Sequence, residues 1–342
     1  MVTRRRLRPR RSAALPSAGA LRPCAAGVVQ RAPGVVRRGA LAVPLALALA
    51  LLALCLLLVP RAAWPDARAP SALRLVDARG RTVVLAAPAE RIVSLLPSLT
   101  ETVCALDACD RLVAVDRYAD WPQQVRALPR VGGLEDTQIE RVVALRPDLV
   151  LAARSSRAID RLEALGIPVL ALGPQNLRQM HEAIATLAQA LGRPAAGRRL
   201  SAQVDERIAA AAARVPPALR GRSVYLEVAS TPFAAGEASF DGELLARLGL
   251  ANIVPAALGA FPQLNPEFVL RAQPYIVMGM AAAVAAMPGR PGWSTLDALR
   301  ARRVCGFDAP TWDTLVRPGP RLADAAEAVA DCLAAIARRA PG

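Results

Sequence analysis

Several residue types that mark common functional classes are scarce or missing in this chain of 342 residues. It has no lysine, and its one histidine, His181, cannot supply the two or three imidazole ligands of a typical zinc site. His181 falls in an amphipathic helical pattern, so we expect it on the surface. No glycine-rich phosphate loop, dinucleotide fingerprint or G-x-S-x-G elbow occurs. The sequence therefore predicts no metal site, no cofactor and no enzymatic activity.

The formal net charge of +15 is concentrated near the N-terminus. Residues 1–69 contain 12 of the 43 arginines but only one of the 28 acidic residues, Asp66. The other 31 arginines and 27 acidic residues leave residues 70–342 with a formal charge of +4. Because this body has no dense basic stripe with interleaved aromatic residues, the sequence predicts no nucleic-acid binding.

Residues 1–69 have the pattern of an arginine-rich leader for export. An apolar run covers residues 41–59, and its part after Pro44 has 15 residues, which is about 22 Å as a helix. This is short for a bilayer core of about 30 Å and fits a secretory signal. The small-x-small sequence at 67–69 is followed by proline and is a poor cleavage site. A retained membrane anchor at residues 41–59 therefore remains the alternative, and the body is exported in both cases.

Export permits disulfide bonds in the body, which contains four cysteines after the leader. Cys104 and Cys109 flank an expected helix end, while Cys305 follows a strand-like stretch and Cys332 lies on the expected last helix. One interpretation pairs the neighbours, Cys104 with Cys109 and Cys305 with Cys332. The other leaves the four residues as buried free thiols.

Two stretches 127 residues apart carry the same pattern. Residues 139–152 and 266–279 each begin with about two helical turns led by a glutamate, Glu140 or Glu267, and each continues through a proline into an apolar run. Proline ends a helix, and a wholly apolar run suits a strand buried on both faces of a parallel sheet. The pair predicts two similar α/β lobes, which the length of the chain also favours. Chance similarity between two helix–strand units is the alternative.

The remaining patterns divide the chain into four segments: a leader at 1–69, an N-terminal lobe at 70–192, a connecting helix at 193–215 and a C-terminal lobe at 216–342. A helical connector is stiff, so we expect no large hinge closure. The N-terminal lobe opens with an expected hairpin at 72–87. Further expected strands cover residues 91–96, 112–115, 167–172, 223–228 and 304–307. Further expected helices cover residues 98–106, 158–165 and 176–191, or begin at Asp241 and at Trp293, and one more ends the chain.

Aromatic residues make up only 4% of the chain, and several fall in expected loops. Tyr118 and Trp121 follow an expected strand, Phe261 precedes the second repeat, and Trp312 lies in an expected loop at 311–318. Aromatic residues on loops at strand ends often line a pocket. Such ends are also where open α/β sheets bind ligands.

Ser98 and Glu101 follow the first expected strand of the body with the spacing of a capping box. A polar turn between a strand and a helix N-terminus is a common ligand site in α/β sheets. For Ser98 alone, an ordinary helix cap is the simpler interpretation.

From about Arg91 to its C-terminus the chain resembles the periplasmic receptors of ABC importers for iron chelates and vitamin B12. The motifs that carry the resemblance are, in order, RIVSLLPSLTE, RLVAVDRYADWP, LPRVGG, IERVVALRPDLVLA, PFAAGEASF, PQLNPEFVLRAQP and RPGPRL. The resemblance implies two α/β lobes joined by one long backbone helix, with the ligand in the cleft between them. It also implies a periplasmic location and an ABC permease dimer in the inner membrane as partner.

The resemblance also assigns roles to individual residues. It implies that Glu140 and Glu267 dock onto arginines of the permease, although an acid near a helix N-terminus can also simply complement the helix dipole. The positions expected to contact the ligand are Tyr118, Trp121, Leu134, Phe261, Trp312, Asp313, Thr314, Leu315, Val316 and Arg317. Leu134 and Phe261 replace tryptophans of the cobalamin receptor's cleft, and Leu248 replaces one cysteine of its bridge, while Cys332 matches the other.

Two classes of function follow. The first is a receptor, expected to be a monomer, that binds cobalamin or a related corrinoid, with an iron–siderophore or haem as the alternative metal chelate. A siderophore pocket would be expected to show more arginines than Arg317 alone. The second is an exported enzyme of unfamiliar type, which the missing catalytic groups disfavour.

Overall fold

The computed structural model describes residues 72–229 and 232–339. The chain divides into two units, Met1–Ala67 and Arg68–Gly342, and all of the described residues belong to the second. The predicted leader, with its apolar run at 41–59, lies outside the described residues. Within them, every helix is too short or too polar to span a bilayer.

The first half of the body, here called the N-terminal lobe, is built on a parallel sheet. Its strands lie in the order β4-β3-β5-β6. They are β3 (Ile92–Ser94), β4 (Leu112–Val115), β5 (Leu149–Ala153) and β6 (Val169–Leu172). A hairpin of β1 (Leu73–Val76) and β2 (Thr82–Leu85) precedes the sheet, as predicted. Its turn contains Gly80 at φ +77°, a conformation that glycine adopts without strain.

Helices cover both faces of this sheet because successive strand side chains point in opposite directions. Leu149 and Leu151 of β5 pack in one cluster with α2 (Pro97–Ala105) and α5 (Leu177–Ala190). Val150 and Ala152 pack in another with α3 (Ile139–Ala144) and α4 (Ala158–Ala164). Because both faces of β5 are covered, all of its side chains must be apolar, as the sequence predicted for this run.

The second half, here called the C-terminal lobe, repeats this arrangement around a second sheet of order β11-β10-β7-β8. Its parallel strands are β7 (Ser223–Ala229), β10 (Ile276–Met280) and β11 (Val304–Phe307). β8 (Phe233–Ala234) pairs antiparallel with β7, and β9 (Ala251–Asn252) also pairs with β7. Its helices are α7 (Phe240–Arg247), α8 (Pro266–Ala272), α9 (Ala281–Ala286), α10 (Asp297–Arg300), α11 (Ala309–Leu315) and α12 (Leu322–Arg339).

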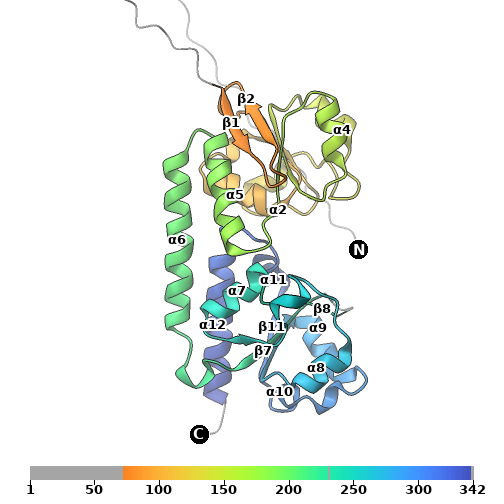
Figure 1. Cartoon of the computed structure of the whole chain (residues 1–342), viewed down its shortest axis with the longest axis vertical. Helices are drawn as coiled ribbons and strands as arrows, with labels where there is room; N and C mark the ends of the chain where they lie inside the picture. Colours follow the sequence, from red (N-terminus) through yellow and green to blue (C-terminus); the bar gives the residue numbers. More distant parts are fainter. Residues whose placement is uncertain (1–71, 230–231, 340–342) are drawn as a thin grey trace, which may run out of the picture. The chain divides into compact units, whose positions relative to one another are not determined.

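One long helix, α6 (Pro194–Ala213), lies between the two halves in the chain. It packs against α5 of the N-terminal lobe and α12 of the C-terminal lobe, as Figure 1 shows. Val204 and Ile208 of α6 are buried in the same cluster as residues of both neighbouring helices. The predicted connecting helix is thus present and joined to both lobes by apolar packing.

The 127-residue offset predicted from the sequence is also the offset between matching elements of the structure. α3 and α8 begin 127 residues apart, and so do β5 and β10. Arg146 and Gln273, also 127 residues apart, both have the left-handed conformation, at φ +47° and +42°. Left-handed backbone is uncommon in residues other than glycine, so its presence at both sites marks one local structure used twice. Each of these residues precedes the proline that ends its helix.

The predicted capping box at Ser98 is wrong. α2 begins at Pro97 with Leu96 as its N-cap, and no side chain caps it. Proline is favoured at the first helical position because it has no N–H to leave unpaired, so the helix begins before Ser98. Ser98 therefore lies within the first turn, where its hydroxyl has no hydrogen-bond partner in the described part of the chain.

The loop predicted at 311–318 is also wrong, because most of it is α11. Asp308 is the N-cap and accepts a hydrogen bond from the Thr311 N–H at 3.1 Å, while Pro310 lies in the first turn. An aspartate cap followed by proline is a helix start signal that the sequence reading missed. His181 likewise differs from expectation. It is partly buried, with 24% of its side chain exposed and Nε2 3.3 Å from Asp205 Oδ1 on α6.

The pairing of neighbouring cysteines is confirmed, and the free-thiol alternative is wrong. Cys104 is bonded to Cys109, and Cys305 is bonded to Cys332. The second bond ties β11 to the last helix across 27 residues, whereas the first closes a loop of only five.

Removing the bond between Cys305 and Cys332 is expected to destabilise the protein more than removing the other. In the chain-entropy model the longer loop is worth about 3.5 kcal/mol and the shorter about 2 kcal/mol. Urea unfolding of the two double alanine variants, Cys305→Ala/Cys332→Ala and Cys104→Ala/Cys109→Ala, tests this order. Equal losses, or a larger loss at Cys104 and Cys109, would contradict the entropic account.

Candidate ligand-binding site

A cavity of about 550 Å³ opens between residues that follow the strands of the two sheets. From the N-terminal lobe it is lined by the segment after β3 (residues 96–98), by Tyr118 after β4, and by Gly173 and Pro174 after β6. From the C-terminal lobe it is lined by the end of β7, the start of α7, Phe261 and the end of α11. Both sheets therefore present their carboxyl ends to the cavity, which is where parallel sheets bind ligands.

Five of the ten residues expected to contact the ligand line this cavity. They are Tyr118, Phe261, Asp313, Val316 and Arg317. Three of them lie together at the end of α11: Asp313 belongs to its last turn, and the residues at 316 and 317 directly follow the helix, where Arg317 Nη2 is 3.0 Å from Asp313 Oδ2.

The other five expected residues do not line the cavity. Trp312 and Leu315 face the core on the opposite side of α11, and Thr314 is also buried. Leu134 is half-buried in the loop before α3. Trp121 is 41% exposed and lines a separate hollow beside α6, with the Arg321 guanidinium 4.8 Å from its ring centre. The helix that replaces the predicted loop is the reason for the difference on α11.

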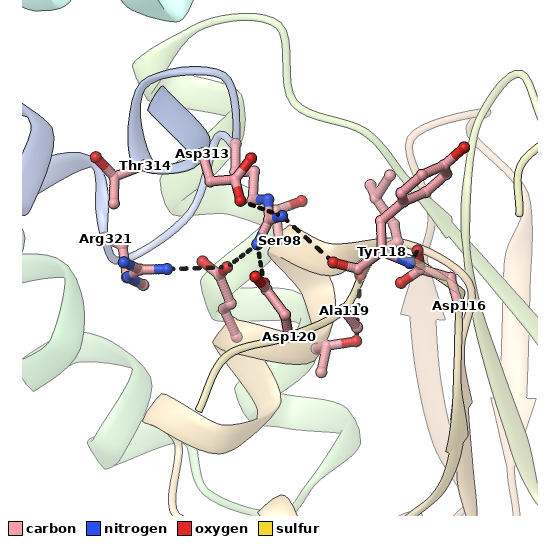
Figure 2. Close-up of polar contacts among 12 residues, drawn as sticks. Ser98, Asp116, Tyr118, Ala119, Asp120, Asp313, Thr314 and Arg321 are labelled. Atoms are coloured by element: carbon pink, nitrogen blue, oxygen red, sulfur yellow. Dashed lines mark hydrogen bonds and ion pairs between the residues drawn. The ribbon is translucent and has the colours of Figure 1, made fainter. Parts of the chain in front are cut away.

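Arg317 lies at the centre of an ion-pair cluster that joins the two lobes. Its Nη1 is 2.9 Å from Glu101 Oε1 and 2.8 Å from Asp120 Oδ1, both on the N-terminal lobe. Its Nη2 is 3.0 Å from Asp313 Oδ2 and donates to the Tyr118 carbonyl at 3.3 Å. Figure 2 shows Asp313 on one side of this cluster and Tyr118 and Asp120 on the other. The guanidinium is thus shared among three carboxylates before any ligand arrives.

Burial sets the charge state of this cluster. Glu101 is 1% exposed, and burial raises its pKa above the ordinary value, which the nearby Arg317 only partly offsets. Arg321 lies 3.5 Å from the same Oε1 and adds a second positive charge. For Asp120, partial burial acts to raise the pKa, but the hydrogen bond from Arg317 prevails and the pKa is lowered. Glu101 therefore depends on its arginine partners to remain ionised.

Asp116 holds the loop that carries Tyr118. Its Oδ2 accepts a hydrogen bond from the Tyr118 N–H at 2.8 Å, while its Oδ1 is buried and has no partner in residues 72–229 and 232–339. Burial raises the pKa of Asp116 to about 6, and the Tyr118 hydrogen bond and nearby arginines only partly compensate. The carboxyl group is therefore more easily protonated in the folded than in the unfolded protein.

A raised pKa at Asp116 predicts a specific pH dependence of stability. The contribution of Asp116 to the free energy of unfolding is fully present below about pH 4. It is lost as the pH rises through about 6, because the folded protein must then ionise a buried carboxyl. In Asp116→Asn the amide oxygen can still accept from Tyr118, and nothing titrates. Between about pH 4 and about pH 7 the wild type should lose about 2 kcal/mol of unfolding free energy relative to the variant. Urea unfolding across this range tests it, and parallel curves would contradict the assignment.

The cavity wall also contains two buried polar residues that are not among the ten expected ligand contacts. Asp241, in the first turn of α7, is 1% exposed, and neither of its carboxyl oxygens has a hydrogen-bond partner among the described residues. Ser98 is 2% exposed and lies in the wall contributed by the N-terminal lobe. Burial raises the pKa of Asp241 well above its ordinary value. Nothing in the local sequence separates Asp241 from an ordinary acid at a helix start.

Glu140 and Glu267 occupy corresponding positions on the two lobes. Each is exposed and lies in the first turn of its helix, α3 or α8. Glu140 has 82% of its side chain exposed and makes only a long ion pair, 3.9 Å, with Arg161. Neither carboxylate is buried against its own lobe, as the docking role requires.

Comparison with known proteins identifies the family. Residues 92–311 match the profile described as periplasmic binding protein. This chain belongs to that family. The chain is 30% identical over 268 residues to the uncharacterized ABC transporter substrate-binding lipoprotein YvrC of Bacillus subtilis. This match covers 75% of the chain and 84% of the relative. The chain is therefore a binding protein of the ABC importer type.

Solved structures of two similar proteins share the two-lobed fold. The periplasmic vitamin B12 binding protein BtuF of Vibrio cholerae is 27% identical, with a TM-score of 0.62, and the match covers 73% of this chain and 99% of that one. The periplasmic haem-binding protein RhuT of Roseiflexus sp. RS-1 is 28% identical, with a TM-score of 0.63, and the match covers 72% and 99%. The predicted α/β class and two-lobed arrangement are confirmed.

Proposed function

We propose that this periplasmic binding protein takes up cobalamin or a related corrinoid in the cavity between its lobes and delivers it to the permease of an ABC importer. The observation that carries the proposal is the lining of the cavity. Tyr118, Phe240 and Phe261 offer apolar surface to a large flat molecule, and the cavity of about 550 Å³ is open to solvent at its mouth. The comparison with a vitamin B12 binding protein supports the same ligand class.

The charges around the cavity disfavour ligands that carry acid groups. Among the described residues that line it, Arg317 is the only one with a cationic side chain. Its guanidinium is already paired with Glu101, Asp120 and Asp313. A haem with two propionates, or an acidic siderophore, would need a cation that these carboxylates do not already neutralise. Haem remains the second candidate because one of the similar solved structures is a haem-binding protein.

The location and the partner follow from the same proposal. The protein acts in the periplasm as a monomer, either free or held at the inner membrane by residues 41–59. Glu140 and Glu267 contact arginines on the two subunits of the permease. Their exposure and their matching places on the two lobes support this role.

Titration calorimetry of the purified protein with cyanocobalamin, haemin and a ferric hydroxamate chelate tests the ligand. We expect saturable binding of cyanocobalamin at a ratio of one to one, with weak or no binding of the other two. Absence of heat with cyanocobalamin at micromolar protein would refute the corrinoid proposal. Saturable binding of haemin instead would replace it with the second candidate and leave the family unchanged.

A further inference from the structure

Two polar side chains in the cavity wall lack partners, and they come from opposite lobes. Ser98 belongs to α2 of the N-terminal lobe, and Asp241 belongs to α7 of the C-terminal lobe. The Ser98 hydroxyl and both oxygens of Asp241 are buried without a hydrogen bond among the described residues. Such groups destabilise a folded protein, and in native structures they are few.

Helix capping does not explain either side chain. α7 is capped by Ser239, whose Oγ accepts from the Gly242 N–H at 2.9 Å, so Asp241 is not needed for that role. α2 starts at Pro97 without a side-chain cap, so Ser98 caps nothing. Both residues nevertheless lie in the wall of the same cavity. A role toward the cavity's ligand accounts for both.

The start of α7 is held firmly against the N-terminal lobe. The Phe240 N–H donates to the Gln175 carbonyl at 2.7 Å, and Glu243 Oε2 accepts from the Leu177 N–H at 2.7 Å. These bonds connect α7 to the start of α5. Asp241 lies between Phe240 and Glu243 in sequence, so its backbone is fixed at the cavity wall before the ligand arrives. The fixed backbone leaves rotation of the side chain as the only movement that Asp241 needs to reach a ligand.

We propose that Asp241 and Ser98 form the polar specificity subsite of this cavity and that they recognise primary amide groups on the ligand. The inference rests on the proposed corrinoid function and adds to it the residues that select the ligand. An amide carries both a donor and an acceptor, so it can form two hydrogen bonds with a carboxyl group and one with a hydroxyl. The Asp241 side chain turns about its Cα–Cβ bond to meet the ligand, since its oxygens lie within the wall when the cavity is empty.

This subsite distinguishes the candidate chelates by the groups on their rims. A corrinoid such as cobalamin carries primary amides around its ring. A haem carries propionates, which would bring a second acid against Asp241 where Arg317 is already paired. Burial raises the pKa of Asp241 and so favours its protonated form, which can donate as well as accept. Amide recognition therefore needs no counter-ion.

The test measures cyanocobalamin affinity and thermal stability of full-length variants in parallel. In Asp241→Leu and in Ser98→Ala we expect the dissociation constant to rise about tenfold or more, as for the loss of one buried hydrogen bond. Asp241→Asn keeps a donor and an acceptor in the same shape and should stay within about threefold of the wild type. Ser156→Ala removes another buried serine, outside the cavity, and is the control expected to bind as the wild type does.

Thermal stability separates ligand recognition from a structural role. Asp241→Leu and Ser98→Ala each remove a polar group without partners, so their melting temperatures without ligand should equal or exceed that of the wild type. Weaker binding together with unchanged or higher stability supports the subsite. A second titration with monocarboxylate derivatives of cyanocobalamin, in which one amide is hydrolysed, should show weaker binding to the wild type for at least one isomer.

The outcomes keep the two proposals apart. If the wild type binds cyanocobalamin and both Asp241→Leu and Ser98→Ala bind it equally well, the subsite is wrong and the proposed function stands. If the wild type does not bind cyanocobalamin, the function fails and the subsite fails with it. If Asp241→Leu does not fold, Ser98→Ala alone decides, because loss of a hydroxyl leaves the backbone of α2 intact.

Discussion

Replacing Arg317 by alanine is expected to destabilise the protein by about 3 kcal/mol at neutral pH. The reason is that the substitution leaves a buried carboxylate, that of Glu101, without its main positive partner. Glu101 is 1% exposed and would lose its closest positive partner, the Arg317 guanidinium at 2.9 Å. The cost should fall at the lower end of the range for broken buried pairs, because Arg321 remains 3.5 Å from Glu101. Urea unfolding monitored by circular dichroism measures the difference.

Arg207 provides a matched control for this substitution. Like Arg317 it pairs with more than one carboxylate, with its Nη2 2.7 Å from Asp324 and 2.9 Å from Glu327. Its side chain is 45% exposed, whereas that of Arg317 is 11% exposed. Exposed pairs contribute little because water solvates both charges, so Arg207→Ala should cost less than about 1 kcal/mol. Similar losses in the two variants would show that burial of Glu101 is not the cause.

The charge on Glu101 can be tested directly with a second substitution. Glu101→Gln in the Arg317→Ala background removes the unpaired carboxylate and should restore most of the lost stability. The single Arg317→Ala variant should also approach the wild type as the pH falls, because protonation removes the charge of Glu101 in both proteins. A loss that is independent of pH, or one that Glu101→Gln does not relieve, would assign the effect to packing.

Replacing Glu140 and Glu267 together by alanine is expected to abolish most transport while leaving ligand affinity unchanged. Both carboxylates are exposed, so neither substitution removes a buried contact. Well-formed pairs with permease arginines are worth roughly 1.5–3 kcal/mol each, and less if they remain wet. Loss of two such pairs lowers the affinity for the permease by about a hundredfold or more. Either single variant should reduce transport less, because the glutamate on the other lobe can still contact the permease.

Uptake of labelled cyanocobalamin by cells, together with calorimetry on the purified protein, measures both quantities. Asp160→Ala/Asp297→Ala is the matched control, since both are exposed acids in the first turn of a helix, one on each lobe. This pair does not occupy the repeated positions, so transport should be normal. Normal transport in the glutamate variant, or loss of ligand binding, would refute the docking role.

The sequence alone was sufficient for the architecture of this protein. The repeat at residues 139–152 and 266–279 predicted two α/β lobes, and the structure places both units at corresponding sites in their sheets. Helical periodicity, helix-ending prolines and wholly apolar strands are local features, so they can be recognised in a single sequence. The neighbouring cysteine pairs were one of two interpretations that the sequence left open, and both bonds close short loops of five and 27 residues within one lobe.

Tertiary structure decided how the candidate site is composed. Trp312 was assigned to a ligand loop, but α11 turns it into the core and leaves Asp313 and Arg317 at the cavity. Arg317 meets Glu101 across 216 residues of sequence, and no local pattern encodes a pairing over that distance. Asp241 has the ordinary appearance of an acid at a helix start. Only the packing of two lobes around one cavity left its carboxyl buried and without a partner among the residues that the structure describes, because burial depends on neighbours distant in sequence.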